Sequence, residues 1–298
     1  MRSQDNNSKS GPTVGVVLGH REGHGDLDIA IRHLTEAIAA APGEAPAIIV
    51  AADRPGRDGT SVNVVRSGAL GPELGAAGIR LLHTDRVALC SSAVGVDPKW
   101  IGAIGRGDVS WVGAGGTIDD RLLHRSVDLA VHRTRFARHA PSLRCDPFPD
   151  ADLAADNAWY DRRALEQVAG SWADGFWEPF VHARLEAGGG LLMCDPAMSA
   201  AMLPGVRLRI ALRQRIDHGR RHGQRWAEGR ARRSVLIGIM TTPAVPVAMT
   251  WRALRARPTS RPTRAATVAV MVLLFSGWAG GELAGRIASL RNAPGRDR

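Results

Sequence analysis

The feature that most constrains this fold is a strand–helix–strand pattern near the N-terminus. Thr13 to Leu18 is a short run rich in β-branched residues, and Ala47 to Ala51 is a second apolar run. Between them, residues 26–41 repeat apolar side chains at helical spacing and end at Pro42-Gly43. This pattern predicts a right-handed βαβ unit in a mostly parallel sheet. The expected fold class is α/β, with a Rossmann-like sheet flanked by helices.

Polar residues follow both predicted strands. Gly19, His20 and Glu22 come after the first strand, and Asp53 comes after the second. Ligands of parallel sheets bind outside the carboxyl ends of the strands, so we expect these residues at the rim of a nucleotide site. For Asp53 an alternative stays open, because the segment around it is rich in Gly, Pro and Asp and is typical of a turn.

A single glutamate in the middle of the chain is the candidate catalytic residue. Glu178 lies between Trp177 and Pro179 at the start of a predicted helix. A carboxylate beside large apolar side chains is partly desolvated, which raises its proton affinity and suits a general base near neutral pH. The alternative is that Glu178 only begins the helix, where the helix dipole favours an acid. The apolar stripe of this helix is predicted to comprise Val181, Ala183, Leu185 and Ala187.

Four short motifs occur around this glutamate in a fixed order. Asn-x-x-Tyr-x-Arg-x-Ala-Leu begins at Asn157, Asp-Gly-Phe-Trp-Glu ends at Glu178, Arg-Leu-x-x-x-Gly begins at Arg184, and Gln-Arg-x-x-His-Gly-Arg spans residues 214–220. In this order the motifs resemble the acceptor half of family 2 glycosyltransferases, specifically the bacterial membrane-associated members with a GT-A fold. The resemblance covers roughly residues 155–225.

The resemblance implies a role for each matching residue. It makes Glu178 the catalytic base, and it places the base and ribose of a nucleotide-sugar donor at the rim that holds Gly19, His20, Glu22 and Asp53. It also implies that the helix around residues 214–220 lies beside the donor phosphates and the acceptor. The residues expected to bind the acceptor or the phosphates are Asn157, Trp177, Gln214, Arg215, His218 and Arg220.

This chain departs from the family where a metal ion is expected. The family holds Mn²⁺ or Mg²⁺ with an Asp-x-Asp after a strand, because hard cations prefer carboxylate oxygens. The matching positions here are Ser91, Ser92 and Ala93, which cannot replace two carboxylates. No metal ligand is therefore predicted, although a divalent cation stays open as a cofactor. Arg215 and Arg220 offer positive charge instead; the alternative is that they form a basic helix face resting on a membrane.

Two further sets of residues resemble metal ligands less well. Acids in a proline-containing loop over residues 143–156 are one set, but acidic loops are usually solvated. The pairs His20/His24 and His218/His222 are the other. Zinc is disfavoured at both, because glycines break the helix that the first pair requires and arginines surround the second. The acidic set comprises Asp146, Asp150, Asp152 and Asp156.

Basic residues are concentrated toward the C-terminus. The net charge is +10 over 298 residues, and between Arg207 and Arg264 the only acids are Asp217 and Glu228. Such a block indicates anionic partners such as lipid head groups or diphosphates. Nucleic acid is not an expected partner, because neither interleaved aromatic residues nor a known motif accompanies the arginines. Three cysteines without metal spacing and an N-terminus without a signal-like apolar region favour a reducing, cytoplasmic setting.

Two apolar segments lie in and after this basic block. Val235 to Trp251 and Ala265 to Gly281 are each near the lower length limit for a membrane span, and an arginine-rich loop joins them. A cytoplasmic basic loop is better explained if both helices lie in the interface or re-enter, with the arginines on anionic lipid. Two buried helices of a soluble domain are the alternative.

The chain is thus predicted to contain a disordered N-terminus (1–12), a GT-A-like domain (13–230), a membrane-associated helical hairpin (231–290) and a basic tail (291–298). The predicted function is transfer of a sugar, with inversion, from a nucleotide-sugar donor to a membrane-linked or glycan acceptor of the cell envelope. The expected location is the cytoplasmic face of the cell membrane. The alternative is a catalytically inactive GT-A-like protein that binds or scaffolds at the membrane.

Overall fold

The computed structural model of the chain describes residues 12–23, 25–55, 62–141, 146–150, 152–228, 230–255 and 265–292. Several predicted features lie outside the described residues: residues 1–11 of the N-terminus, residues 293–298 of the tail, His24, Cys145 and the loop arginines Arg257, Arg261 and Arg264.

The predicted βαβ unit is confirmed. Strand β1 (Val14–His20), helix α1 (Leu27–Ala40) and strand β2 (Ala47–Ala52) follow one another, and β1 pairs with β2 in parallel. Helix α1 begins where expected because the Asp26 carboxylate accepts hydrogen bonds from the backbone N–H groups of Asp28 (3.0 Å) and Ile29 (3.1 Å).

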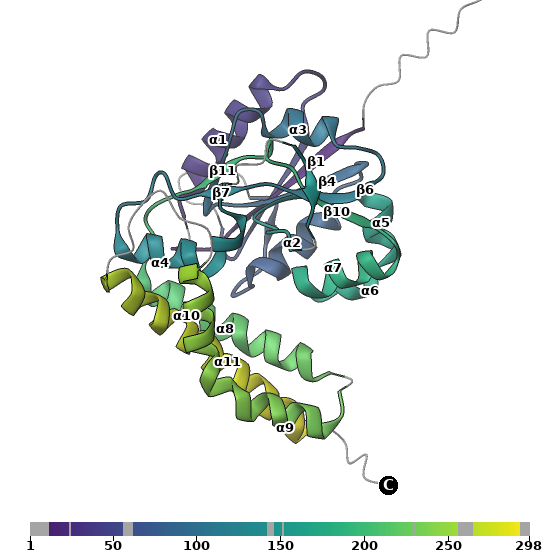
Figure 1. The fold of residues 1–298 in the computed structure, drawn as a ribbon. Helices are drawn as coiled ribbons and strands as arrows, with labels where there is room; N and C mark the ends of the chain where they lie inside the picture. The colour runs from purple at the N-terminus through teal and green to yellow at the C-terminus, as the bar shows by residue number, and fades with distance from the viewer. Residues whose placement is uncertain are drawn as a thin grey trace, which may run out of the picture.

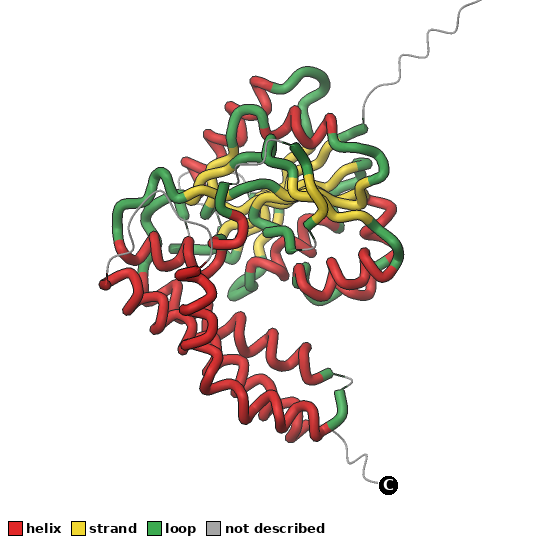
Figure 2. The backbone as a smooth tube through the Cα atoms, in the orientation of Figure 1, coloured by secondary structure: helices red, strands yellow, loops and turns green. Residues whose placement is uncertain are grey.

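Six further strands complete the main sheet: β3 (Val64–Val65), β4 (Arg86–Ser91), β6 (Trp111–Gly115), β8 (Phe148–Pro149), β9 (Asn157–Asp161) and β10 (Leu191–Cys194). The strand order is β3-β2-β1-β4-β9-β6-β10-β8. The first four strands are mutually parallel, β9 is antiparallel to both of its neighbours, and β6 and β10 are again a parallel pair. The predicted α/β class with a mostly parallel sheet is therefore confirmed (Figures 1 and 2).

A small second sheet lies beside the main one. It contains β5 (Val94–Val96), β11 (Ala200–Met202) and β7 (Ile118–Asp119), in that order. Because β5 follows β4 after only a two-residue turn, this sheet closes over the end of β4.

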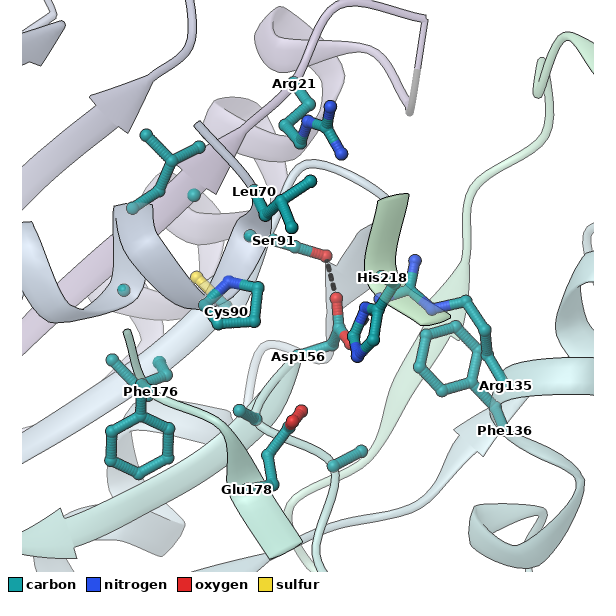
Figure 3. A pocket seen from close by; sticks show the side chains of 18 of the residues that line it. Arg21, Leu70, Cys90, Ser91, Arg135, Phe136, Asp156, Phe176, Glu178 and His218 are labelled. Carbon is teal, nitrogen blue, oxygen red and sulfur yellow. Dashed lines mark hydrogen bonds and ion pairs between the residues drawn. The ribbon is translucent and has the colours of Figure 1, made fainter. Parts of the chain in front are cut away.

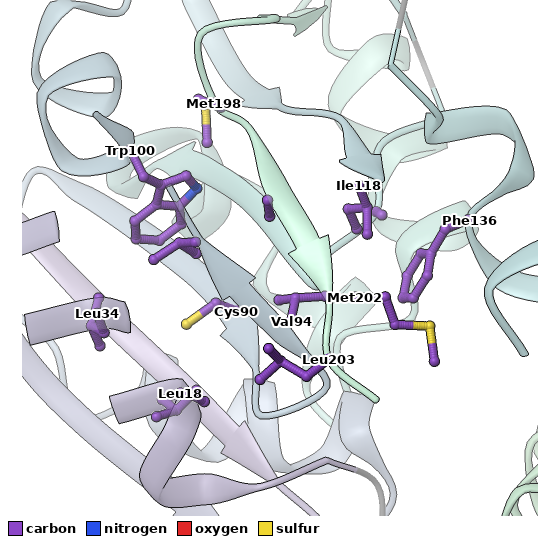
Figure 4. Packing of buried hydrophobic residues seen from close by; sticks show 14 of the residues in the cluster. Leu18, Leu34, Cys90, Val94, Trp100, Ile118, Phe136, Met198, Met202 and Leu203 are labelled. Carbon is purple, nitrogen blue, oxygen red and sulfur yellow. The ribbon is translucent and has the colours of Figure 1, made fainter. Parts of the chain in front are cut away.

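Helices cover both faces of the main sheet. Along β1, apolar side chains point alternately to one face and the other, so both faces need a covering layer. Val16 and Leu18 point into one core with α1, α3 (Trp100–Arg106) and α4 (Ser126–Arg135), as Figure 4 shows for the side chains around Leu18 and Trp100. Val17 points to the opposite core, formed with α2 (Gly71–Ile79), α5 (Arg162–Gln167), α6 (Ala169–Trp172) and α7 (Glu178–Ala187). A short 3₁₀ turn, Ala137–His139, follows α4.

One predicted helix stripe is wrong in part. Val181 and Leu185 of α7 are buried as expected, whereas Ala183 and Ala187 are exposed. The inward face instead continues through His182, whose Nε2 lies 2.8 Å from the Tyr160 hydroxyl oxygen. Residues one apart on a helix differ by about 100°, so His182 faces inward beside Val181 while Ala183 turns to solvent.

The C-terminal helices form a layer that extends away from the sheets (Figure 1). They are α8 (Leu208–Ala227), α9 (Arg232–Thr241), a 3₁₀ turn (Thr242–Ala244), α10 (Val245–Arg255) and α11 (Ala265–Asn292). Both predicted apolar segments lie in helices of this layer. The stretches Arg233–Arg255 and Ala265–Arg291 are long and apolar enough to span a membrane, with 22% and 39% of their apolar windows buried. Length and composition alone do not separate such helices from the core helices of a soluble protein.

Helices α8 and α11 run side by side in the same direction with their backbones in contact. A Cβ atom added at Gly281 would lie 2.0 Å from the Ile216 carbonyl oxygen, and one at Gly223 would lie 2.2 Å from the Glu282 carbonyl oxygen. Only glycine permits this approach. The domain boundary predicted at residue 230 stays a prediction, because α8 on one side of it packs along α11 on the other.

A buried ion pair within α11 lies against α8. The Arg286 Nη2 and Glu282 Oε1 atoms are 2.7 Å apart, and the Arg286 guanidinium lies 4.3 Å from the centre of the Trp226 ring on α8. The α8–α11 contact therefore combines close backbone packing with a cation–π contact.

Candidate functional site

A pocket of about 290 Å³ lies where the carboxyl ends of β1 and β4 meet α8. It is lined by Gly19 and Arg21 at the end of β1 and by Ser91 and Ser92 at the end of β4. This is the crevice in which parallel sheets bind ligands. Figure 3 shows the side chains that converge on it from the sheet, α4, α7 and α8. Its other charged or polar lining residues include Thr134, Arg135, His139, Asp152, Asp156, Glu178, Gln214, Arg215 and His218.

Glu178 lies in this pocket at the first turn of α7. Its side chain is half-buried, and burial, followed by the nearby charge of Asp156, raises its pKa from 4.5 to about 7. Backbone hydrogen bonds from Ala155 and from its own N–H act in the opposite direction. The predicted desolvation of this carboxylate is confirmed. Near neutral pH the group can both accept and release a proton.

Guanidinium groups from separate elements gather around the same space. Arg21 comes from the loop after β1, Arg135 from the end of α4 and Arg215 from α8. Burial and then the charge of Arg135 lower the pKa of Arg215 to about 9. Among the described contacts, the one hydrogen bond of Arg215 is from its Nη2 atom to the Thr134 hydroxyl oxygen, at 3.4 Å. Arg135 is paired with Asp156, whereas no carboxylate partner of Arg215 is among the described contacts. Three guanidiniums around one pocket favour an anionic ligand between them.

Two buried polar atoms in the pocket support that conclusion. The Arg21 Nε and Gln214 Nε2 atoms are shielded from solvent and have no hydrogen-bond partner within the described part of the chain. The Asp53 carboxylate lies 4.0 Å from Arg21 Nε, beyond hydrogen-bond distance. Buried donors of this kind are normally satisfied, so these two are suited to a bound acceptor group such as a phosphate oxygen.

His218 lies against the guanidiniums as a neutral ring. Burial, followed by the charges of Arg215 and Arg135, lowers its pKa to about 3. Its ring packs edge-on against Trp177, with 4.7 Å between the ring centres. His218 can therefore act in the pocket as a hydrogen-bonding group, but it does not carry charge at neutral pH.

Ser91 and Ser92, which stand at positions of the family's metal motif, form hydrogen bonds with other side chains of the protein. Ser91 Oγ donates to Asp156 Oδ1 at 2.5 Å, and Ser92 is buried with its hydroxyl oxygen 2.8 Å from His20 Nδ1. Asp156 is the carboxylate beside Ser91, and its other oxygen lies 2.7 Å from Arg135 Nη2. A cation here would compete with Arg135 for that one carboxylate and would stand close to other arginines. The residues present do not fit a divalent metal ion.

The acidic loop does not supply a metal site either. Asp152 is paired with Arg138, and Asp150 Oδ1 accepts a hydrogen bond from the Asp152 N–H at 3.0 Å. Across the residues with described positions, no group of three or more His, Cys, Asp or Glu side chains is arranged to hold a metal ion.

Among the predicted donor residues, only Gly19 lines the pocket. His20 is turned to Ser92, the Glu22 carboxylate lies 2.6 Å from Arg54 Nη1, and Asp53 accepts a hydrogen bond from the Glu22 N–H at 3.1 Å. The structure thus brings His20, Glu22 and Asp53 together at the ends of β1 and β2, beside the pocket and outside its lining.

Among the residues predicted to bind acceptor or phosphate, Gln214, Arg215 and His218 line the pocket, whereas Asn157, Trp177 and Arg220 do not. The Asn157 amide is fully buried and donates to the carbonyl oxygens of Thr117 (3.0 Å) and Met198 (2.8 Å). Arg220 is exposed because it follows His218 by two residues, about 200° around the helix. Trp177 faces a neighbouring cavity.

Sequence reasoning missed Arg21 and Arg135 as site residues and treated Asp156 only as one of several loop acids. Arg21 directly follows the β1 strand, so the strand-end rule that selected His20 and Glu22 applied to it equally. Arg135 lay in a basic segment without a motif, and nothing local marked it.

Comparison with known proteins gives likeness of fold only. No protein-family model and no curated protein matches the chain. One similar solved structure is GalNAc-T7 with UDP, GalNAc and Mn²⁺, at 12% identity and a TM-score of 0.47, covering 67% of this chain and 45% of that one. Another is the mannosyltransferase PcManGT from Pyrobaculum calidifontis in complex with GDP-Man and Mn²⁺, at 13% identity and a TM-score of 0.46, covering 96% and 77%. This chain spans less than half of the GalNAc-T7 chain, and the chemistry of its pocket follows from its own residues.

Proposed function

We propose that the chain is a glycosyltransferase with a GT-A architecture that moves a sugar from a nucleotide-sugar donor to an acceptor hydroxyl. One observation carries the proposal: the Glu178 carboxylate and a cluster of arginines line the same strand-end pocket. A base and an anion site are the two elements that glycosyl transfer from a nucleoside diphosphate needs.

The proposed reaction inverts the anomeric centre. The ionised Glu178 takes the proton of the acceptor hydroxyl, and the acceptor oxygen attacks C1 of the donor sugar. The bond between C1 and the diphosphate oxygen breaks, and its electron pair leaves with the diphosphate. Arg21, Arg135 and Arg215 stabilise the negative charge that develops there. No step assigns a role to a metal ion, since the residues at the matching positions do not fit one.

The first test is Glu178→Gln. Glutamine has nearly the same shape but cannot accept the proton, so we expect the transfer rate to fall by about 10²–10⁴-fold while nucleotide binding is retained. Glu186→Gln is the matched control, because Glu186 is an exposed acid on the same helix. Unchanged transfer by Glu178→Gln would remove the residue from the mechanism.

The second candidate function is that of a catalytically inactive GT-A-like protein that binds or scaffolds at the membrane. One observation favours it. Ser91, Ser92 and Ala93 offer no carboxylate where the family carries its metal ligands. A calorimetric titration with UDP and GDP, each with and without Mn²⁺, separates the two functions. Binding that does not depend on Mn²⁺ supports the transferase, whereas absence of binding to any nucleotide supports a scaffold.

We further propose that the protein acts at the cytoplasmic face of a membrane and that its acceptor is lipid-linked or a glycan. Exposed apolar side chains on α9 and α10, among them Met240 and Val247, support this location, as do the arginines at the end of α10. Nucleic acid is not a proposed partner. Recovery of the full chain in the soluble fraction at low salt without detergent would contradict membrane association.

A further inference from the structure

One carboxylate lies between the base and the arginines of the candidate site. Asp156 comes directly before β9, and its side chain is 12% exposed. Its Oδ1 atom accepts a hydrogen bond from Ser91 Oγ at the end of β4, at 2.5 Å, and its Oδ2 atom lies 2.7 Å from Arg135 Nη2 at the end of α4. Two elements that are distant in sequence therefore fix this side chain from two sides (Figure 3). The proposed reaction assigns Asp156 no part.

The residue before Asp156 contacts the candidate base directly. The Ala155 backbone N–H donates a hydrogen bond to the Glu178 carboxylate. Because Ala155 and Asp156 are neighbours in the chain, the contacts of the Asp156 carboxylate also fix the position of this N–H. A continuous set of contacts thus runs from the ends of β4 and α4 through Asp156 and Ala155 to Glu178 on α7. A base that is held in this way needs little rearrangement before it takes a proton.

Charge acts along the same path. Among the side-chain charges, that of Asp156 acts most strongly on Glu178 and raises its pKa, whereas the next, that of Arg135, lowers it. Because Asp156 and Arg135 form an ion pair with each other, their opposite effects on Glu178 come from one contact. The other titratable groups that face Glu178 or line its pocket are Arg21, His139, Asp152, Tyr160, Arg215 and His218.

We propose that Asp156 is a positioning residue, which holds the Glu178 carboxylate in place through the Ala155 N–H and shields it from the charge of Arg135. The inference rests on the proposed function, in which Glu178 is the base. No proton transfer is assigned to Asp156, whose two oxygen atoms are contacted by Ser91 and Arg135.

The direct test is the titration of Glu178 in the free, full-length chain, followed by carbon-13 NMR of the glutamate carboxyl groups. Loss of one signal in Glu178→Gln assigns the resonance. Asp156→Asn keeps the shape of the side chain and can still accept from Ser91, but it loses the charge. We expect the midpoint of the Glu178 titration to move to lower pH by about 0.5 or more, because a neighbouring negative charge is removed.

Arg135→Gln is the second variant, and its expected effect has the opposite sign. It removes the guanidinium on the other side of the same ion pair, so the midpoint of the Glu178 titration should move to higher pH. A general loosening of the pocket would expose Glu178 in both variants and would move both midpoints to lower pH. Two shifts in the same direction, or no shift in Asp156→Asn, would overturn the proposal.

Asp152→Asn is the matched control. Asp152 lines the same pocket, and its substitution changes the net charge equally, but its carboxylate is 43% exposed and is paired with Arg138. The midpoint of the Glu178 titration is expected to stay within about 0.2 of that of the unchanged chain, because solvent screens an exposed charge. Equal shifts in Asp152→Asn and Asp156→Asn would overturn the proposal, since net charge alone would then account for both.

Transfer assays separate positioning from a purely structural role. In Asp156→Asn the rate should fall, and the pH midpoint of the rate should move to lower pH together with the Glu178 titration. A variant that was only less stable would keep the midpoint of the unchanged chain. Calorimetric affinity for UDP or GDP should not fall by more than about twofold, because Arg135 loses an internal partner and keeps its charge. A larger loss would place Asp156 in the anion site and overturn the proposal.

Failure of this inference is distinguishable from failure of the proposed function, because the NMR titration requires no transfer. A chain that transfers sugar through Glu178, but whose Glu178 titration ignores Asp156→Asn, keeps the function and loses only the role of Asp156. A chain without transfer activity, in which the two midpoints still move in opposite directions, loses the function and with it the catalytic meaning of this contact.

Discussion

At the scale of single residues, Glu178 links pH to both activity and stability. Its pKa is raised from 4.5 to about 7, first by burial and then by Asp156. If it acts as the proposed base, it is active only when ionised, so the transfer rate should rise with pH through about 7 and then level off. The rate should be measured with the donor site equally saturated at each pH. A profile that is flat between about pH 5 and 8 would contradict this assignment.

The same shift predicts a stability change with a definite sign. Between pH 4.5 and about 7 the folded chain binds a proton at Glu178 that the unfolded chain has released, so its contribution to the free energy of unfolding falls as pH rises. Glutamine at this position cannot ionise. The unfolding temperature of Glu178→Gln, relative to the unchanged chain, should therefore increase from pH 4.5 to 7 and be constant above that range. A difference that does not depend on pH would contradict the burial of this charge.

Arg215 is the residue whose removal should weaken donor binding most directly. It lies on the pocket face of α8, and its charge is only weakly compensated. Arg215→Gln should lower the affinity for UDP or GDP by about tenfold or more, since a charged hydrogen bond contributes about 1.5–3 kcal/mol. Arg213→Gln is the control: that side chain is 86% exposed and lies 4.0 Å from Asp217. Equal losses in calorimetric titrations of the two variants would mean that the pocket does not bind the diphosphate.

At the scale of elements, α11 determines where α8 places its site residues. Gly281 contacts the Ile216 backbone, between Arg215 and His218 in sequence. Gly281→Ala would force the helices apart, and we expect a loss of about 1–3 kcal/mol in the free energy of unfolding together with weaker nucleotide binding. Gly280→Ala is the control, because a Cβ there meets no atom within 4 Å. Its better helix propensity should make that variant neutral or more stable by up to about 1 kcal/mol. Indistinguishable thermal unfolding of the two variants would contradict the close packing.

At the scale of the whole molecule, the features that arise from neighbouring residues could be predicted from the sequence. The features that arise from packing between distant segments could not. The β1–α1–β2 unit could be predicted because a β-branched run and the Asp26 cap act over a few residues. The convergence of Arg21 and Arg135 could not, because it arises from packing between segments more than a hundred residues apart in sequence. Helix phase explains why the motif that includes Gln214 contributes to the pocket while its last residue, Arg220, does not. Asn157 matched its motif, but its amide is used in the core.

The outer surface of the C-terminal helix layer bears the remaining prediction, which concerns how the molecule meets a membrane. Met240 and Trp251 are 79% and 55% exposed, and the Arg255 guanidinium lies 4.1 Å from the centre of the Trp251 ring. An apolar side chain beside a cation suits the boundary between acyl chains and anionic head groups. Met240→Ser/Trp251→Ser should weaken sedimentation with phosphatidylglycerol vesicles by about tenfold or more, because each buried side chain contributes about 1.5–3 kcal/mol. Val109→Ser is the control, since Val109 is 95% exposed beside β6. If the double variant and the control bind vesicles equally, this surface does not enter the bilayer, and the two apolar helices belong to a soluble domain.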